Sequence, residues 1–444
     1  MVSITPIAVV RDSRTFKQAA SLARFGYRSI VVEGEASELQ AQELPFELIP
    51  IPGAQRARDP VAGAGPAGGA PEPERSEERP ESDTPTAPRE TDPDQVDFVR
   101  RRWRAVRAAW YRWRPRARLL EVIANLQWRW RWSRSMYEAL PGADLYIAHS
   151  FPVLPSVLLK AARTRTPLSY DAHDAYFEMN PDRRGLWVWG AIERLGVRRA
   201  RKFATVSTGL AAVLEERFGR RPEVIRNCHE LRLDREVERD LRAVTGVGAG
   251  DCLLVMVGQL KPGTAVREGL LALRQLPERV HLAFVGRGHD RSRELVDQLG
   301  LDGRVHLVEP VPTTDVISFI RGADASVLLY RPVSQNYLYG LPNGFFNAVA
   351  AGLPLLYPAL VEIEALARRY QLGARFDPSE PDSIAAAIRS LLDDPDAAAR
   401  YRAGAERARQ ELNWENEEVQ FRRLIESAID GRVPATPRPR ATVG

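Results

Sequence analysis

The stretch from Ala325 to Pro358, ASVLLYRPVSQNYLYGLPNGFFNAVAAGLPLLYP, most constrains the fold of this chain. An apolar run of strand length, Ala325–Tyr330, is followed by a polar loop. Pro342 then opens a helical segment that ends at Gly352, and Leu353–Tyr357 is a second apolar run. Proline at a helix start and glycine after its end support these boundaries. The order predicts a βαβ unit, whose helix N-terminus can hold an anion such as a diphosphate.

Apolar, strand-like runs alternate with helix-like segments along most of the 444 residues. Ile4–Val10 precedes a helical pattern over Ser13–Phe25, and Ser29–Val32 is the next strand-like run. The alternation returns over residues 144–226 and again from residue 252. It predicts parallel sheets with helices on both faces, and the length allows two domains of about 200 residues each. In the first strand-to-helix turn, we expect Ser13 to cap the helix.

We place the N-terminal domain at residues 1–230, a connection at 231–250 and the C-terminal domain at 251–411. Residues 52–97 contain no aromatic residue and are rich in Pro, Gly, Ala, Glu and Arg. Such a composition buries too little apolar surface to offset ordering, so we predict a disordered insertion. The Pro- and Arg-rich tail over residues 431–444 is predicted to be disordered as well.

Residues 100–134 have the opposite character. They carry twelve arginines against one acid, Glu121, and six of the nine tryptophans of the chain. Trp103, Trp110 and Trp113 fall on one face of a predicted helix, and arginine fills much of the remainder. A basic helix with an aromatic face suits an anionic membrane surface. Two alternatives stay open: a core helix with a solvated arginine face, and nucleic-acid binding, for which the surrounding fold gives no support.

The two cysteines, Cys228 and Cys252, predict a reducing compartment without a disulfide framework. We expect them to be buried small residues and not metal ligands. No apolar run reaches the roughly 20 residues that span a bilayer, and the first residues lack the basic and apolar regions of a signal peptide. We therefore expect a cytoplasmic chain that is peripheral at the inner face of the cell membrane through residues 100–134.

The pattern N-Y-x-Y-x-L-P-N-x-x-F-x-x-x-x-A-x-G-x-P, within the stretch described first, resembles the donor-site segment of group 1 (family 4) glycosyltransferases. Met256–Leu260, Ala283–Gly288 and Val305–Pro312 follow the order of the family's C-terminal domain, and Asp144–His149 and Ser169–Glu178 resemble segments of its N-terminal domain. The resemblance implies an α/β protein of the GT-B fold. Two Rossmann-like, doubly wound domains would face each other across a cleft, and a helix over residues 412–430 would cross back to the N-terminal domain.

On the acceptor or sugar side, the resemblance implies three residues. His173 matches a histidine near the transferred sugar, and we predict it as the catalytic residue. His149 also ends a strand and matches a family position, and Asp174 follows His173 directly. The alternative for each histidine is a structural one, in which it only caps the turn that follows its strand.

On the donor side, the resemblance implies residues that bind a nucleoside diphosphate with cations and helix N-termini. Lys261 or Arg267 would supply positive charge, and Gly286 would border the base; the alternative for the cations is a solvated helix start. The predicted donor-binding residues are Lys261, Arg267, Gly286, Asn336, Pro342, Asn343 and Asn347. Loop asparagines are also common for turn reasons alone.

The chain departs from the family pattern at four positions of the donor-site segments. Asn347 stands where the family has a glutamate that accepts both ribose hydroxyls, and Tyr339 replaces the other acid of the E-x7-E signature. Gly344 replaces a basic residue, and Gln259 replaces an arginine. A neutral acceptor binds a hydroxyl less strongly than a carboxylate does, so donor affinity is expected to fall by about one to two orders of magnitude.

The resemblance implies a retaining enzyme that moves a hexose from a nucleotide diphosphate sugar to a lipid-linked or polysaccharide acceptor. It implies no metal and no cofactor besides the donor substrate. A second hypothesis, motivated by the four departures, is a catalytically weakened relative that binds a glycan or a protein partner. We expect no nucleic-acid partner.

Overall fold

A computed structural model of the chain describes residues 1–37, 44–53, 127, 129–179 and 186–429. The predicted disordered insertion lies outside the described residues except at positions 52 and 53, and so does the tail over residues 431–444. Most of the Arg- and Trp-rich segment also lies outside them. Its last residues belong to a helix over residues 129–139, in which Trp130 is 63% exposed.

Within the described residues, the first sheet has seven parallel strands in the order β3-β2-β1-β4-β5-β6-β7. The strands are β1 (Val2–Thr5), β2 (Ile30–Glu33), β3 (Glu47–Pro50), β4 (Tyr146–His149), β5 (Leu168–Ala172), β6 (Lys202–Thr205) and β7 (Glu223–Val224). Val2 of β1 lies between Ile30 of β2 and Tyr146 of β4. Strands β1, β2, β4 and β5 are fully buried. Their polar residues, such as Ser3, Ser169 and Asp171, are buried as well, because helices cover both faces of a parallel sheet.

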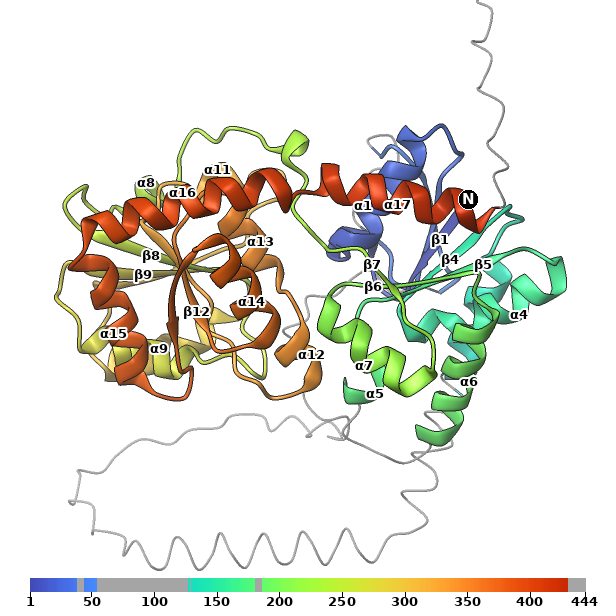
Figure 1. The fold of residues 1–444 in the computed structure, drawn as a ribbon, viewed down its shortest axis with the longest axis horizontal. Helices are drawn as coiled ribbons and strands as arrows, with labels where there is room; N and C mark the ends of the chain where they lie inside the picture. The colour runs from blue at the N-terminus through green and yellow to red at the C-terminus, as the bar shows by residue number, and fades with distance from the viewer. Residues whose placement is uncertain (38–43, 54–126, 128, 180–185, 430–444) are drawn as a thin grey trace, which may run out of the picture. The chain divides into compact units, whose positions relative to one another are not determined.

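The helices of this half lie on both faces of its sheet, α1 on one face and α4, α6 and α7 on the other (Figure 1). They are α1 (Ser13–Arg24), α4 (Leu154–Thr164), α5 (Tyr176–Met179), α6 (Leu186–Arg199) and α7 (Thr208–Phe218). Short 3-10 helices, η1 (Val9–Arg11) and η4 (Phe151–Val153), precede α1 and α4. The cap of α1 differs from our prediction, because the Asp12 side chain, and not that of Ser13, accepts from the Thr15 N–H.

The second sheet has six parallel strands in the order β10-β9-β8-β11-β12-β13 among the described residues. They are β8 (Cys252–Val257), β9 (Val280–Val285), β10 (Val305–Val308), β11 (Ala325–Val327), β12 (Leu355–Pro358) and β13 (Gly373–Phe376). The accompanying helices are α8 (Leu241–Thr245), α9 (Val266–Arg274), α10 (Arg293–Gln298), α11 (Val316–Ile320), α12 (Gln335–Tyr339), α13 (Asn343–Ala350), α14 (Val361–Tyr370), α15 (Pro381–Leu392) and α16 (Pro395–Glu411). Two parallel, Rossmann-like sheets confirm the predicted fold class.

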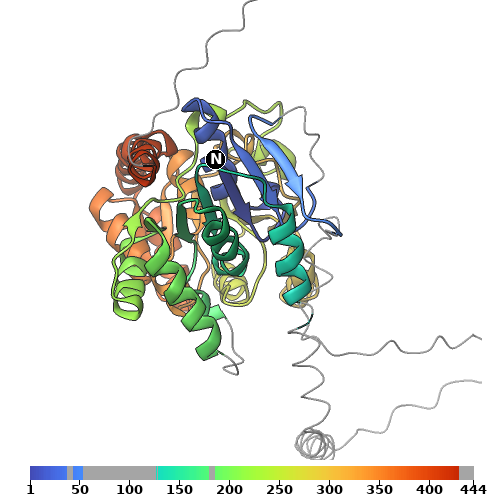
Figure 2. The same cartoon turned by 90° about the vertical axis from the view of Figure 1, so that its right-hand side faces the viewer.

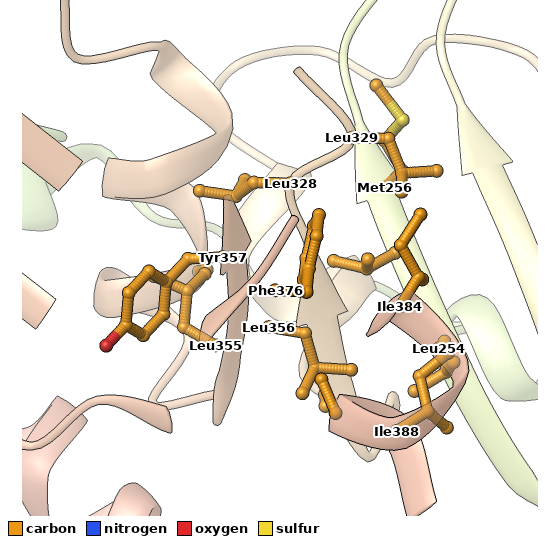
Figure 3. Packing of buried hydrophobic residues seen from close by; sticks show 14 of the residues in the cluster. Leu254, Met256, Leu328, Leu329, Leu355, Leu356, Tyr357, Phe376, Ile384 and Ile388 are labelled. Carbon is orange, nitrogen blue, oxygen red and sulfur yellow. The ribbon is translucent and has the colours of Figure 1, made fainter. Parts of the chain in front are cut away.

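The core of the second half fills the space between its sheet and α15 (Figure 3). Leu254 and Met256 of β8 and Leu356 of β12 pack there with Ile384 and Ile388 of the helix. All five side chains are at most 3% exposed. Burial of this kind supplies about 1.5–3 kcal/mol for each large apolar side chain, and it fixes the carboxyl ends of the strands at one edge of the sheet.

The stretch from Ala325 to Pro358 folds as predicted at its two ends and differs in its middle. Pro342 precedes α13, and Gly352 takes a φ of +71° after it, the left-handed conformation that ends helices at glycine. The predicted loop contains the short helix α12, so the prediction of a loop was wrong there. The Tyr337 and Leu338 N–H groups donate to the Ser334 carbonyl, which begins this helix.

The last helix, α17 (Trp414–Ala428), packs against the first half of the chain. Its apolar face contacts Leu22, Leu145 and Ile147. The Trp414 ring is fully buried, its Nε1–H donates to Ser21 Oγ at 3.0 Å, and the Lys17 ammonium lies 5.3 Å from the ring centre. None of the helices in the described part of the chain is long and apolar enough to cross a membrane.

Replacement of Trp414 by alanine is expected to lower the free energy of unfolding by about 3–5 kcal/mol, because it removes a fully buried indole and leaves a cavity. Trp414→Phe is the control. It keeps most of the ring volume and loses the bond to Ser21, so it should cost about 1 kcal/mol. Urea unfolding followed by circular dichroism measures both values, and equal losses in the two variants would contradict this account of the contact.

Candidate active site

Strand order places a site at the carboxyl ends of the first sheet. The order reverses between β1 and β4, where neighbouring connections leave to opposite faces, and ligands of open parallel sheets bind at such switch points. Asp12 follows β1, His149 ends β4, and Asp171 and His173 lie at the end of β5. These four side chains form one polar cluster, which we call the His173 cluster.

Asp171 is the most strongly held member of the His173 cluster. Arg14 Nε and Nη2 donate to its two carboxylate oxygens at 2.8 Å each, and Gln18 Nε2 donates to Oδ2 at 2.7 Å. The two charged side chains are only 2% and 4% exposed. Burial alone would raise the pKa of Asp171, but the guanidinium of Arg14 and the hydrogen bonds from His149 and His173 together hold this pKa well below its usual range. The carboxylate is therefore a fixed negative charge.

Two imidazoles lie beside this carboxylate. His149 Nδ1 and His173 Nε2 are 3.1 Å apart, and they lie 3.5 and 3.7 Å from Asp171 Oδ2. His149 is fully buried, whereas the His173 side chain keeps 16% of its surface exposed. His173 can therefore reach a ligand, and His149 lies behind it. Burial lowers the pKa of His149.

Asp12 completes the cluster from the α1 side. It accepts hydrogen bonds from the Thr5 and Thr15 hydroxyls at 2.8 and 2.6 Å, and its Oδ1 lies 3.9 Å from His173 Nδ1. Burial by itself would lower the pKa of His173, yet the carboxylates of Asp12 and Asp171 raise it. The surroundings of His173 thus favour its protonated, positively charged form.

The atoms of His149, Asp171 and His173 lie within 4.8 Å of one another, a spacing that a metal ion could use. Both Asp171 oxygens already accept from Arg14. A cation at this place would compete with a buried guanidinium for the same oxygens, at a high cost in repulsion. The trio therefore fits a proton-holding network better than a metal site.

Four polar residues in or beside the cluster are not among the predicted site residues: Asp12, Arg14, Gln18 and Asp171. Asp171 could have been found from the run YDAHD, in which it stands two positions before His173. Arg14 and Gln18 are one helical turn apart on α1, so both face the same side. Their contact with Asp171 of β5 could not be predicted from sequence spacing, because Arg14 and Asp171 lie 157 residues apart in the chain.

The second half contributes the N-terminus of α13. Pro342 precedes the helix and no side chain caps it. Asn343 is exposed, and its Oδ1 accepts from Asn227 Nδ2 at 2.9 Å. Asn347 lies one turn further along and is half-buried, with no hydrogen bond from its amide to another described residue. First-turn N–H groups and the partial positive charge of a helix N-terminus favour an anion here.

Two glycines bring the α13 terminus and the strand ends close together. A Cβ at Gly344 would lie 2.7 Å from the Val257 carbonyl oxygen at the end of β8, so this position has no room for the basic side chain of the family pattern. Gly286 has a φ of +151°, and a Cβ there would lie 2.1 Å from the Gly258 carbonyl oxygen. Both positions therefore require glycine for packing.

The predicted cations of the second half differ in their surroundings. The Lys261 ammonium lies 6.0 and 5.4 Å from the ring centres of Tyr330 and Tyr337. It also lies within electrostatic range of Asp174, which is exposed on the loop after His173. Arg267 is the second residue of α9, and its side chain is 68% exposed. Lys261 is thus the cation that faces the loop carrying His173.

Helix α12 bonds to the first half of the chain. Asn336 Oδ1 accepts from the Ala175 N–H at 2.7 Å, and its Nδ2 donates to the Ala175 carbonyl at 3.2 Å. The Tyr339 carbonyl accepts from Ser207 Oγ at 2.6 Å. A Cβ at Gly209 would lie 2.4 Å from the Tyr339 ring, so that glycine makes room for it. The Asn336 side chain therefore holds the backbone of the loop that follows His173, and the Tyr339 ring packs against Gly209.

Two family models match the chain. "Glycosyl transferases group 1" matches residues 237–408, and "Glycosyltransferase Family 4" matches residues 80–232. The two matches correspond to the second and the first half. The chain belongs to the group 1, family 4 glycosyltransferases.

Curated glycosyltransferases align with parts of the chain. The D-inositol 3-phosphate glycosyltransferase of Thermobispora bispora is 27% identical over 199 residues, which are 42% of this chain and 45% of that protein. Thus the chain spans about half the length of that relative. The glycogen synthase of Mycobacterium tuberculosis is 28% identical over 316 residues, 66% of this chain and 71% of that protein.

Solved glycosyltransferase structures share the fold. Sucrose-phosphate synthase from Thermosynechococcus elongatus superposes with a TM-score of 0.66 at 16% identity, covering 97% of this chain and 98% of that one. Anabaena HepE in complex with UDP-glucose gives 0.62 at 16% identity, covering 96% and 99%. At such identities the likeness establishes the GT-B fold of this glycosyltransferase, as the motifs predicted.

The raised pKa of His173 predicts a pH-dependent contribution to stability. A raised pKa means that folding favours the protonated form, so this contribution is present below the unfolded pKa of about 6.5 and is lost as pH rises through the folded value. The difference in Tm between the native chain and His173→Gln should therefore be larger at acidic than at alkaline pH. Differential scanning fluorimetry across the neutral range measures it, and a difference independent of pH would refute the proposed charge on His173.

Proposed function

We propose that the chain is a retaining hexosyltransferase that uses a nucleotide diphosphate sugar as donor and needs no metal. The observations that carry the proposal are the uncapped α13 N-terminus and the His173 cluster, in a chain that belongs to a family of glycosyltransferases. The complex of HepE with UDP-glucose supports a donor of this class. A leaving diphosphate needs positive partners, and the chain offers helix N–H groups and Lys261.

Each residue has a role that its surroundings suit. The α13 terminus and Lys261 would hold the diphosphate, and Asn347 would accept from or donate to the ribose. His173 would donate a hydrogen bond to the sugar or to the phosphate as charge develops in the transition state. Asp171, fixed by Arg14, and the buried His149 would together hold His173 in place.

The acceptor in this proposal is a lipid-linked glycan or a polysaccharide at the cytoplasmic face of the membrane. The relatives include an enzyme named for D-inositol 3-phosphate and one named for glycogen. The Arg- and Trp-rich segment over residues 100–134 supports a membrane location through its composition.

Nucleoside diphosphates are expected to raise the Tm of the chain. A ligand present at 100 times its Kd stabilises the folded state by about 2.7 kcal/mol, so a panel of UDP, GDP and ADP and their sugar derivatives should reveal the base. Lys261→Ala should weaken the shift, whereas Lys160→Ala, which changes a lysine of α4, is the matched control. If none of these nucleotides stabilises the chain, the transferase proposal fails.

Asn347→Glu is expected to tighten nucleoside diphosphate binding by about tenfold, because a carboxylate accepts more strongly from the ribose hydroxyls than an amide does. Asn347→Gln is the control, since it adds the same length without charge and should bring no gain. Isothermal titration calorimetry measures both, and 2′,3′-dideoxynucleotides should not show the gain. Unchanged affinity of Asn347→Glu would mean that this side chain does not meet the ribose.

A second candidate is a catalytically weakened relative that binds a glycan or a protein partner. The packing roles of Tyr339 and Gly344 favour it, because both positions lack the charged group of the family signature. It predicts nucleotide binding without turnover, or no nucleotide binding at all. Turnover of any nucleotide sugar in the presence of a lipid or glucan acceptor would exclude it.

A further inference from the structure

The outer surface of α4 and α6 carries positive charge without compensation. The two helices and the turn after α4 contain six basic residues: Lys160, Arg163, Arg165, Arg194, Arg198 and Arg199. No carboxylate among the described residues pairs with any of them. The acid of α6, Glu193, is 2% exposed and accepts from the Tyr170 hydroxyl inside the protein. The surface therefore presents cations and no anions from these two helices.

Large apolar side chains stand among these cations. Leu159 of α4 is 52% exposed, and Leu195 and Val188 of α6 are 48% and 37% exposed. Val188, Ile192 and Leu195 follow one another at helical spacing, so they form a stripe along α6. Single exposed apolar residues are ordinary on protein surfaces. It is unusual, however, that several exposed apolar residues gather on two adjacent helices whose cations have no carboxylate partner among the described residues.

The two helices form a continuous surface. A Cβ at Gly196 of α6 would lie 2.4 Å from Leu154 of α4, so the helices approach each other closely. In Figure 2 they lie next to each other and face the viewer, in green. Tyr137 adjoins α4, because the Lys160 ammonium lies 5.1 Å from its ring centre and Arg163 donates to its hydroxyl at 3.5 Å.

We propose that this surface, defined by Leu159, Lys160, Arg163, Leu195, Arg198 and Arg199, docks on an anionic lipid bilayer. Leucine and valine side chains enter the boundary between headgroups and acyl chains, while arginine and lysine extend to the phosphates. A tyrosine at the edge suits the same boundary. Nucleic acid would use the cations but would gain nothing from the exposed leucines, so the combination favours a membrane.

This surface would specify how the chain reaches the membrane, and the inference rests on the proposed function. The surface belongs to the half that carries His173, and it lies on the face of the first sheet opposite to α17 (Figure 1). It would add to any contact made by residues 100–134 and would fix the orientation of the first half on the bilayer. An acceptor anchored in the same bilayer would then approach that half from one direction.

A fluorescent label on α6 tests the contact directly in the full chain. Leu195→Cys is labelled with an environment-sensitive fluorophore; Cys228 and Cys252 are buried, so the introduced thiol reacts selectively. Val419→Cys on α17 is the matched control, since Val419 is 49% exposed. Vesicles of phosphatidylcholine with about one third phosphatidylglycerol should shift the emission at 195 to the blue and leave 419 unchanged.

Charge reversal provides a second measurement. Arg198→Glu should weaken co-sedimentation with these vesicles by about tenfold or more, because each basic residue near an anionic surface contributes about fivefold. Arg423→Glu on α17, an exposed arginine without a carboxylate partner among the described residues, should leave it unchanged. Melting curves show whether each variant is folded.

Three results would overturn the proposal: sedimentation without an emission shift at 195, an equal shift with RNA or polyphosphate, or equal losses in the two arginine variants. A nucleotide titration of the same labelled chain separates this test from the transferase proposal. Vesicle contact without nucleotide binding would support the membrane surface and contradict the proposed donor site.

Discussion

The buried pair between Arg14 and Asp171 is the interaction on which the candidate site depends. It joins α1 to β5 across the switch point of the first sheet, and both side chains are almost inaccessible to water. Removal of one partner of such a pair typically costs about 3–5 kcal/mol, because the other charge stays buried. The pair therefore fixes a negative charge behind His149 and His173, and this charge adds to that of Asp12 in raising the pKa of His173.

The two parallel sheets can be predicted from the sequence, but the contacts within the His173 cluster cannot. Runs such as Cys252–Val257 are apolar because parallel strands are covered on both faces, so their pattern predicts a doubly wound fold. His173 could be placed at a strand end for the same reason. The partners of that strand end come from distant segments, and neither charge nor spacing in the chain pairs Arg14 with Asp171 or Asn336 with Ala175. Helix α12 was not predicted because its five residues are too few to show helical periodicity. Its hydrogen bonds to distant segments cannot be read from the sequence.

Two departures from the family signature have local explanations in packing. At position 344 a side chain would collide with the Val257 carbonyl, and at position 339 an aromatic ring fills the space left open by Gly209. Each explains why a charged residue is absent, and Gly344 lets the α13 terminus approach the Val257 carbonyl. The proposed donor site would thus rely on helix N–H groups and Lys261, without the charged side chains of the family signature.

The position of α17 has a consequence for the order in which the protein can be made. Leu22, Leu145 and Ile147 are covered by side chains from residues 414–428, which are synthesised after the whole second half of the chain. Until these residues have been made, the α17 side chains that pack on Leu22, Leu145 and Ile147 are missing. The first half can therefore reach its final packing only after the second half has been synthesised.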